Sequence, residues 1–191
     1  MPVSSGIVDL LQAAAAQFER IVASLPAETW DNATPSNITV REIVDHVVAG
    51  NIFAIRLLAG ASAAEATAGL DADHLGDDPL FAVSATCESQ WSAFAGADEE
   101  RMLYHPSGGI SVDTFVRFRL GELVVHAWDL AVGGRLDRSL DPSVVEGLWD
   151  MVEPHLDEMR SMGTFGDGAS GNLPEGASNQ TRLLDAFGRR P

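Results

Sequence analysis

The stretch GELVVHAWDLA, residues 121–131, decides the fold. Its apolar residues recur at steps of three and four, which is the spacing of a helix that buries one face. Glu122, His126 and Asp129 fall on that same face, and Arg119 joins them one turn earlier. Burying an ionisable side chain costs on the order of several kcal/mol unless the group is paired or binds a metal. The clustering of four such groups therefore needs a chemical explanation.

Metal binding is the explanation that the spacing favours. Glu122 and His126 are four residues apart, so they lie one above the other on the helix and can hold one ion together. An earlier helix places His46 on its own buried face. Two imidazoles and one carboxylate suit zinc, and also nickel or iron, and three protein ligands leave positions open for water or substrate. The sequence thus predicts a catalytic-type divalent metal ion held by His46, Glu122 and His126.

Other interpretations of these residues stay open. A single inward histidine is usually a hydrogen-bonded core residue, and Arg119 with Glu122 or Asp129 could form a buried salt-bridge network without a metal. A dinuclear site that includes Glu42 is disfavoured, because di-iron bundles use Glu-x-x-His spacing and Glu42 has a role at a helix start. Asp129 and Arg119 are the candidate catalytic residues, interpreted as outer groups that orient a ligand ring or receive an anionic substrate group.

Hydrophobic periodicity and helix-end signals extend the helical prediction over most of the chain. Long helices are expected over about residues 7–25, 39–59, 79–95 and 111–134. Thr39 and Glu42 form a capping box at the second start. The residues expected to face inward on the third helix are Leu80, Val83, Cys87, Trp91 and Phe94. A fifth helix opens at Pro142, with a kink at Pro154. Its expected inward residues are Val145, Leu148, Val152 and Met159.

The connections carry weaker signals. Residues 26–38 predict a loop, residues 60–78 a connection with one helical turn, and residues 102–105 a short extended piece before a turn at 106–109. A final short helix, capped by Ser178, is expected to dock on the bundle. Its apolar residues are Leu183, Leu184 and Phe187. The length of 191 residues predicts one all-α domain. We expect residues 1–162 to form a metal-binding helical bundle and residues 163–191 an irregular tail with the short docking helix.

Composition excludes several classes of partner. A formal charge of -16 would repel phosphate backbones and anionic lipid, so nucleic acid and membrane surfaces are not expected to bind. No apolar stretch approaches the roughly 20 residues of a membrane helix, and the N-terminus lacks a signal peptide. Cys87 is the single cysteine, so no internal disulfide can form. The sequence therefore predicts a soluble cytoplasmic protein, a monomer or a homodimer, that acts on small molecules.

Position along the chain indicates roles for five further residues. Trp30, in the loop over residues 26–38, and Asn51, on the second helix, are the predicted cofactor-binding residues near the metal. His105 precedes the turn into the fourth long helix and could overhang the mouth of the site. His74 and His155 are expected at the surface.

Two segments resemble a known family. TPSNITVREIVDHVV, residues 34–48, and GELVVHAWDLA, residues 121–131, are similar to the DinB-like superfamily, in the branch related to mycothiol-dependent maleylpyruvate isomerase. The resemblance covers about residues 10–159, and RLLDAFGR, residues 182–189, looks like the ending of single-domain members. It implies an up-down-down-up four-helix bundle whose metal is bound by one histidine and a later Glu-x-x-x-His pair. Those positions match His46, Glu122 and His126.

The resemblance also implies a chemistry. Related enzymes use the metal to bind a low-molecular-weight thiol as thiolate, which attacks an electrophile, and mycothiol points to an actinobacterial source. The isomerase carries a second, C-terminal domain, whereas here only a short tail follows the bundle, and Ile38 replaces the aromatic residue often found before Thr-Val-Arg. The expected function is a mycothiol S-transferase or isomerase that acts on a small electrophile. The alternatives are a non-enzymatic metal- or small-ligand-binding module and a metal-free helical interaction protein.

Overall fold

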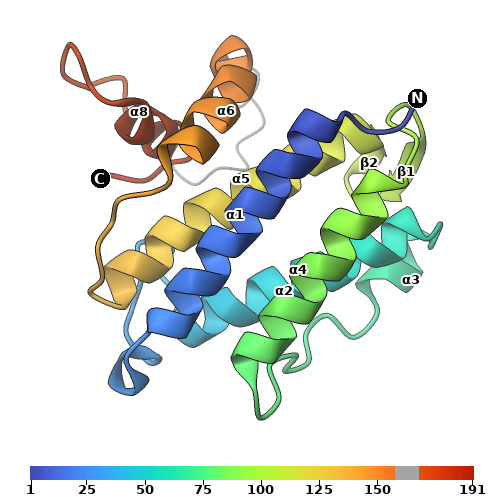
Figure 1. Cartoon of the computed structure of the whole chain (residues 1–191), viewed down its shortest axis with the longest axis horizontal. Coiled ribbons are helices and arrows are strands. Elements are labelled where there is room, and N and C mark those ends of the chain that lie inside the picture. The colour runs from blue at the N-terminus through green and yellow to red at the C-terminus, as the bar shows by residue number, and fades with distance from the viewer. Residues whose placement is uncertain (158–167) are drawn as a thin grey trace. The chain divides into compact units, whose positions relative to one another are not determined.

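Four long helices form the first part of the chain in the computed structural model, which describes residues 1–157 and 168–191. They are α1 (Ser5–Ser24), α2 (Val40–Leu58), α4 (Pro79–Ala95) and α5 (Val112–Gly133). Helices α1 and α2 each pack against both α4 and α5. Figure 1 shows α1 and α5 running in one direction and α2 and α4 in the other. The all-α prediction and the up-down-down-up bundle are therefore confirmed.

The helix starts follow from the capping residues. At α2 the Glu42 backbone N–H donates to Thr39 Oγ1 at 3.2 Å, while the Thr39 N–H donates to Glu42 Oε2 at 2.7 Å. Asp78 accepts from the Phe81 N–H at the start of α4, and Ser111 accepts from the Thr114 N–H at the start of α5. Each bond satisfies an amide donor that the first helical turn leaves free.

The core comes from the inward stripes of the four helices. Its fully buried large side chains include Leu11, Phe18, Ile43, Leu57, Phe94, Leu120 and Leu123. On α4 the prediction was partly wrong, because Leu80 is 40% exposed and the inward position near the end of the stripe belongs to Gln90. The buried stripe runs through Val83, Cys87, Gln90 and Phe94 at steps of four, three and four, which is one face of a helix. Leu80 continues this spacing, but it lies in the first turn of α4, where its side chain is exposed.

The segment between α4 and α5 is a hairpin. Strands β1 (Met102–His105) and β2 (Gly108–Ser111) pair antiparallel, with His105 opposite Gly108. The extended piece at residues 102–105 was predicted, but the turn predicted at 106–109 is shorter, since Gly108 and the residue after it belong to β2. Gly108 has a φ of +119°, a conformation that residues with a Cβ rarely adopt. This glycine lets the chain reverse over two residues. No parallel sheet occurs in the described part of the chain.

The remaining connections contain short helices. The loop over residues 26–38 includes the 3₁₀ turn η1 (Ala27–Thr29), and the connection over residues 60–78 includes α3 (Ala63–Thr67), as the expected helical turn. None of the helices within residues 1–157 and 168–191 has the length and apolarity that a membrane span needs.

The chain divides into two compact units, residues 1–138 and residues 139–191. The second unit contains α6 (Pro142–Val152), η2 (Glu153–His155) and α8 (Asn179–Ala186), with α8 packed against α6. The α-helix gives way to a 3₁₀ turn around Pro154, where the kink was expected. Buried side chains in this unit include Val145, Leu148, Val152, Leu183, Leu184 and Phe187. The predicted boundary between residues 162 and 163, and the predicted inward Met159, lie outside the described residues.

Candidate metal centre

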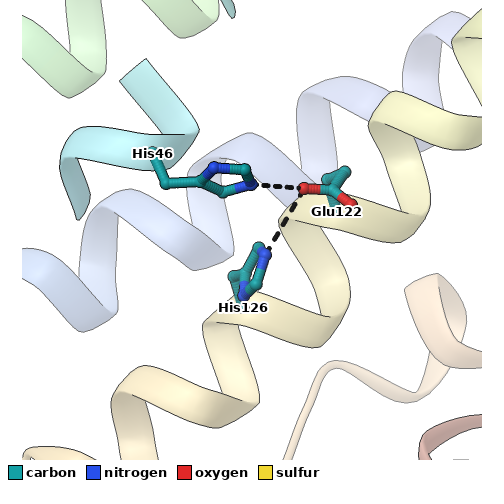
Figure 2. A group of neighbouring side chains, drawn as sticks. All are labelled: His46, Glu122 and His126. Carbon is teal, nitrogen blue, oxygen red and sulfur yellow. Dashed lines mark hydrogen bonds and ion pairs between the residues drawn. The ribbon is translucent and has the colours of Figure 1, made fainter. Parts of the chain in front are cut away.

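Helices α2 and α5 bring the three predicted ligands together. His46 Nε2 lies 2.9 Å from Glu122 Oε2, and His126 Nε2 lies 3.4 Å from the same oxygen. One donor atom from each residue falls within 4.8 Å of the other two. Figure 2 shows the His46 ring reaching from α2 toward α5, with both imidazoles turned to one carboxylate oxygen. The two rings meet edge to face, with centroids 5.2 Å apart.

The hydrogen bonds of His126 test whether a cation fits this cluster. His126 Nδ1 lies 3.0 Å from Asp129 Oδ2, and an ionised carboxylate only accepts hydrogen bonds, so Nδ1 carries the proton. A neutral ring then directs the lone pair of Nε2 at the carboxylate oxygen of Glu122. Two acceptors attract each other only through a shared cation or proton. Two imidazoles and one carboxylate are a donor set of divalent transition-metal sites, so these residues fit such an ion.

The surroundings of Glu122 and His126 shift the pKa values of both side chains. Burial opposes the ionised form of Glu122, but hydrogen bonds from His126 and His46 and the positive charges of His126 and Arg119 hold its pKa well below the usual range. Burial also opposes the charged form of His126, yet its hydrogen bonds to Asp129 and Glu122 and their negative charges raise its pKa. A proton and a metal ion therefore compete for His126 Nε2.

The cluster is closed on one side and open on the other. The His126 side chain is 11% exposed, whereas the His46 side chain is 52% exposed and that of Glu122 is 33% exposed. The solvent-exposed side of the cluster is therefore the side of His46.

Asp129 lies directly behind His126. It is fully buried and accepts hydrogen bonds from His126 Nδ1 and, at 2.6 Å, from Ser36 Oγ. A role for Asp129 in orienting the ring of a metal ligand stays a prediction. Ser36 was missed, because it belongs to a loop 93 residues away in the sequence and loops carry no periodic signal.

Arg119 lies in the core between α2 and α4. Its Nε donates to Gln90 Oε1 at 2.8 Å, and its Nη2 donates to Asn51 Oδ1 at 3.0 Å and to the Val47 carbonyl at 3.5 Å. A Cβ on Gly50 would lie 2.5 Å from Nη1, so only glycine leaves room for this guanidinium. Arg119 is 6% exposed and contacts neutral oxygens. It contributes long-range positive charge to Glu122.

The two predicted cofactor-binding residues make their hydrogen bonds with residues other than the three candidate ligands. Asn51 is fully buried on the side of α2 that faces α4, where its Nδ2 donates to Thr86 Oγ1 at 3.2 Å and to Cys87 Sγ at 3.4 Å. Trp30 is half-buried at the entrance to α2, and its carbonyl accepts from the Arg41 backbone N–H at 2.9 Å. A role for either residue in ligand binding stays a prediction.

The other histidines take different places. His105 packs edge to face on Phe53 and Phe115, which are seven residues, about two helical turns, from His46 and Glu122. Burial lowers the pKa of His105. His155 is exposed, as predicted. His74 is not at the surface, because the acidic loop folds back on α2 and its backbone N–H donates to Asp45 Oδ1 at 2.8 Å.

Comparison with known proteins places this site in a family. The family model described as the mycothiol maleylpyruvate isomerase N-terminal domain matches residues 11–131, more than half of the 191 residues. The matched range contains all three candidate ligands. Comparisons with curated proteins and with solved structures gave no match.

Proposed function

From the fact that the chain belongs to the family of mycothiol maleylpyruvate isomerase N-terminal domains, we propose that it is a metal-dependent thiol S-transferase or isomerase. In this proposal His46, Glu122 and His126 hold one divalent ion, with zinc as the first candidate and nickel or iron as others. Mycothiol is the proposed cosubstrate and a small electrophile the acceptor. The observation that carries the proposal is the convergence of the three donor atoms within 4.8 Å.

The charge of the donor set supports an anionic thiol ligand. A bound divalent ion supplies a Lewis acid that lowers the pKa of a coordinating thiol. The two imidazoles are neutral and Glu122 adds one negative charge, so the set leaves one net positive charge unbalanced. A thiolate neutralises that charge, and the side of the cluster near the exposed His46 gives it access.

The reaction then has two forms. In a transfer, the thiolate sulfur forms a bond to the electrophilic carbon, and the leaving group departs with its electron pair. In an isomerisation, the sulfur adds to the substrate and leaves again, so that the thiol is recovered. Asp129 contributes by keeping the proton of His126 on Nδ1, which leaves Nε2 free as a donor atom. We further propose that the protein works in the cytoplasm, as a monomer or homodimer.

Metal content and thiol transfer test the proposal together. Purified protein should hold about one equivalent of zinc by elemental analysis, and His46→Ala should lose it. The matched control is His155→Ala, which removes an exposed histidine from the second unit. The zinc-loaded protein should accelerate conjugation of mycothiol to monochlorobimane over the metal-free protein. Stoichiometric zinc without any acceleration across a panel of electrophiles would favour the non-enzymatic binding module.

A further inference from the structure

The loop before α2 is anchored on the last turns of α5. Ser36 Oγ donates to Asp129 Oδ2 at 2.6 Å, and Asn32 Nδ2 donates to the Gly133 carbonyl at 2.8 Å. Asp129 and Gly133 are four residues apart, so the loop follows one turn of the helix along a single face.

That face is the one that carries the metal ligands. Glu122, His126, Asp129 and Gly133 follow one another at steps of four, three and four, which is one stripe of α5. Glu122 and His126 supply two ligand atoms of the candidate metal centre, and Asp129 and Gly133 accept the hydrogen bonds that anchor the loop. Asp129 links the two groups, because its Oδ2 accepts hydrogen bonds from both His126 and Ser36.

Close packing at Gly133 makes this anchorage possible. A Cβ at Gly133 would lie 2.7 Å from Val40 Cγ2, at the start of α2, and 2.9 Å from Thr34 Cγ2, in the loop, distances at which both side chains would have to move. The loop is also closed on itself. The Asn37 backbone N–H donates to the Thr34 carbonyl at 3.0 Å, and Thr34 Oγ1 donates to the Ile38 carbonyl at 2.7 Å. These two hydrogen bonds fix the backbone on both sides of Ser36.

We infer that the loop over residues 32–38 is a positioning element of the metal centre. Ser36 orients the Asp129 carboxylate, and Asp129 fixes both the tautomer and the ring orientation of His126. The inference rests on the proposed metal site. Because Asp129 is fully buried, water cannot readily replace a lost serine hydroxyl, so the effect of removing it is transmitted to His126. Coupling between two sites is reciprocal, so a bound ion also stabilises the docked loop.

Serine variants test the hydroxyl itself. Ser36→Ala should weaken zinc affinity by about 10-fold, in the range found when an outer hydrogen-bond partner of a metal ligand is removed. Ser36→Thr keeps the hydroxyl and should restore affinity to near the wild-type value. The control is Ser24→Ala, whose hydroxyl donates to the Arg20 carbonyl within α1 and should leave affinity unchanged. Affinity is measured by competition with a chromophoric chelator, and thermal melting of the metal-free proteins establishes that each variant is folded.

Two glycine substitutions test the position of the loop without removing a metal ligand or a side-chain hydrogen bond. Gly133→Ala should weaken zinc binding, because its methyl group displaces the loop. Gly96→Ala should not, since the nearest atom to a Cβ there is 4.0 Å away. The imidazole ¹⁵N and ring proton signals of His126 provide an activity-free readout. The metal-free wild type should show the proton on Nδ1, and Ser36→Ala should shift these signals.

The outcomes separate this inference from the proposed function. If wild-type protein binds zinc and both Ser36→Ala and Gly133→Ala bind it equally well, the positioning role is refuted and the proposed function stands. Unchanged affinity in Ser36→Ala with unchanged His126 signals refutes it as well. If the wild-type protein binds no zinc, both fall together.

Discussion

His46 and Glu122, 76 residues apart in the sequence, meet across α2 and α5 with the imidazole Nε2 2.9 Å from the carboxylate Oε2. The contact joins the exposed histidine of the cluster to the carboxylate that both histidines share. Glu122 also supplies the only carboxylate among the three candidate ligands, which makes it the residue whose alteration is most informative.

Glu122→Gln should lower zinc affinity by about 100-fold or more, because the variant keeps the shape of the side chain and loses its charge. Chelator competition measures the change. Glu42→Gln is the matched control, since Glu42 belongs to the capping box at the start of α2 and faces solvent. Equal affinity in Glu122→Gln and wild type would show that the ion, if bound, is held elsewhere.

Zinc affinity should fall with decreasing pH as His126 takes up its proton. The raised pKa of His126 means that protons compete with the metal at higher pH than for an ordinary histidine, so the fall should begin above about pH 6.5. Zinc titrations by calorimetry, in buffers of different ionisation enthalpy, should show proton release. The absence of proton release at every pH tested would contradict competition between protons and zinc at His126.

The same shift predicts an opposite pH dependence for the stability of the metal-free protein. A histidine whose folded-state pKa is raised contributes stability that is fully present below the unfolded pKa and lost as pH rises through the folded value. Metal-free protein should therefore keep this contribution at and below about pH 6.5 and lose it as the pH rises from there through the raised pKa of His126, and His126→Gln should remove it. Denaturant unfolding of the two proteins across this pH range measures the difference.

Gly50→Ala should destabilise the bundle by about 2–4 kcal/mol, because the added methyl group overlaps the buried guanidinium of Arg119 and displaces it from Gln90 and Asn51. Gly6→Ala is the matched control. It also lies in a helix, but its Cβ would have no neighbour closer than 3.7 Å. The free energies of unfolding come from urea titrations. A Gly50→Ala protein as stable as Gly6→Ala would mean that Arg119 does not need this gap.

Cys87 should be inert in the folded protein. Its thiol is buried and desolvation raises its pKa to about 12, so almost no thiolate exists at neutral pH. Because it is the single cysteine, a thiol-reactive chromophore reports on it alone. We expect reaction only after unfolding, whereas a Ser89→Cys, Cys87→Ala double variant should react at once through its exposed position. Rapid labelling of folded wild type would contradict the burial.

The helices and the convergence of His46, Glu122 and His126 could be predicted because both leave a periodic signal. Glu122 and His126 stand four apart on an otherwise apolar stripe, and Thr39 with Glu42 announces the start of the helix that carries His46. Each of these features is visible within a few residues of sequence.

The residues that the sequence did not reveal act through contacts between distant, irregular segments. Ser36 reaches Asp129 from a loop, and Gly133 is close to Thr34 only because that loop folds onto α5. The second strand of the hairpin depends on the positive φ of Gly108. No hydrophobic repeat marks any of these positions. Their partners are set by tertiary packing, which single-sequence periodicity does not contain.

The separation of the donor atoms along the chain has a consequence for biogenesis. His46 comes from α2, while Glu122 and His126 come from α5, so a nascent chain released up to the end of α4 lacks two of the three donors. In the proposed site, an ion would meet all three ligand atoms only after α5 has emerged and packed against α2. Loading of the proposed site would then follow the assembly of the bundle during synthesis.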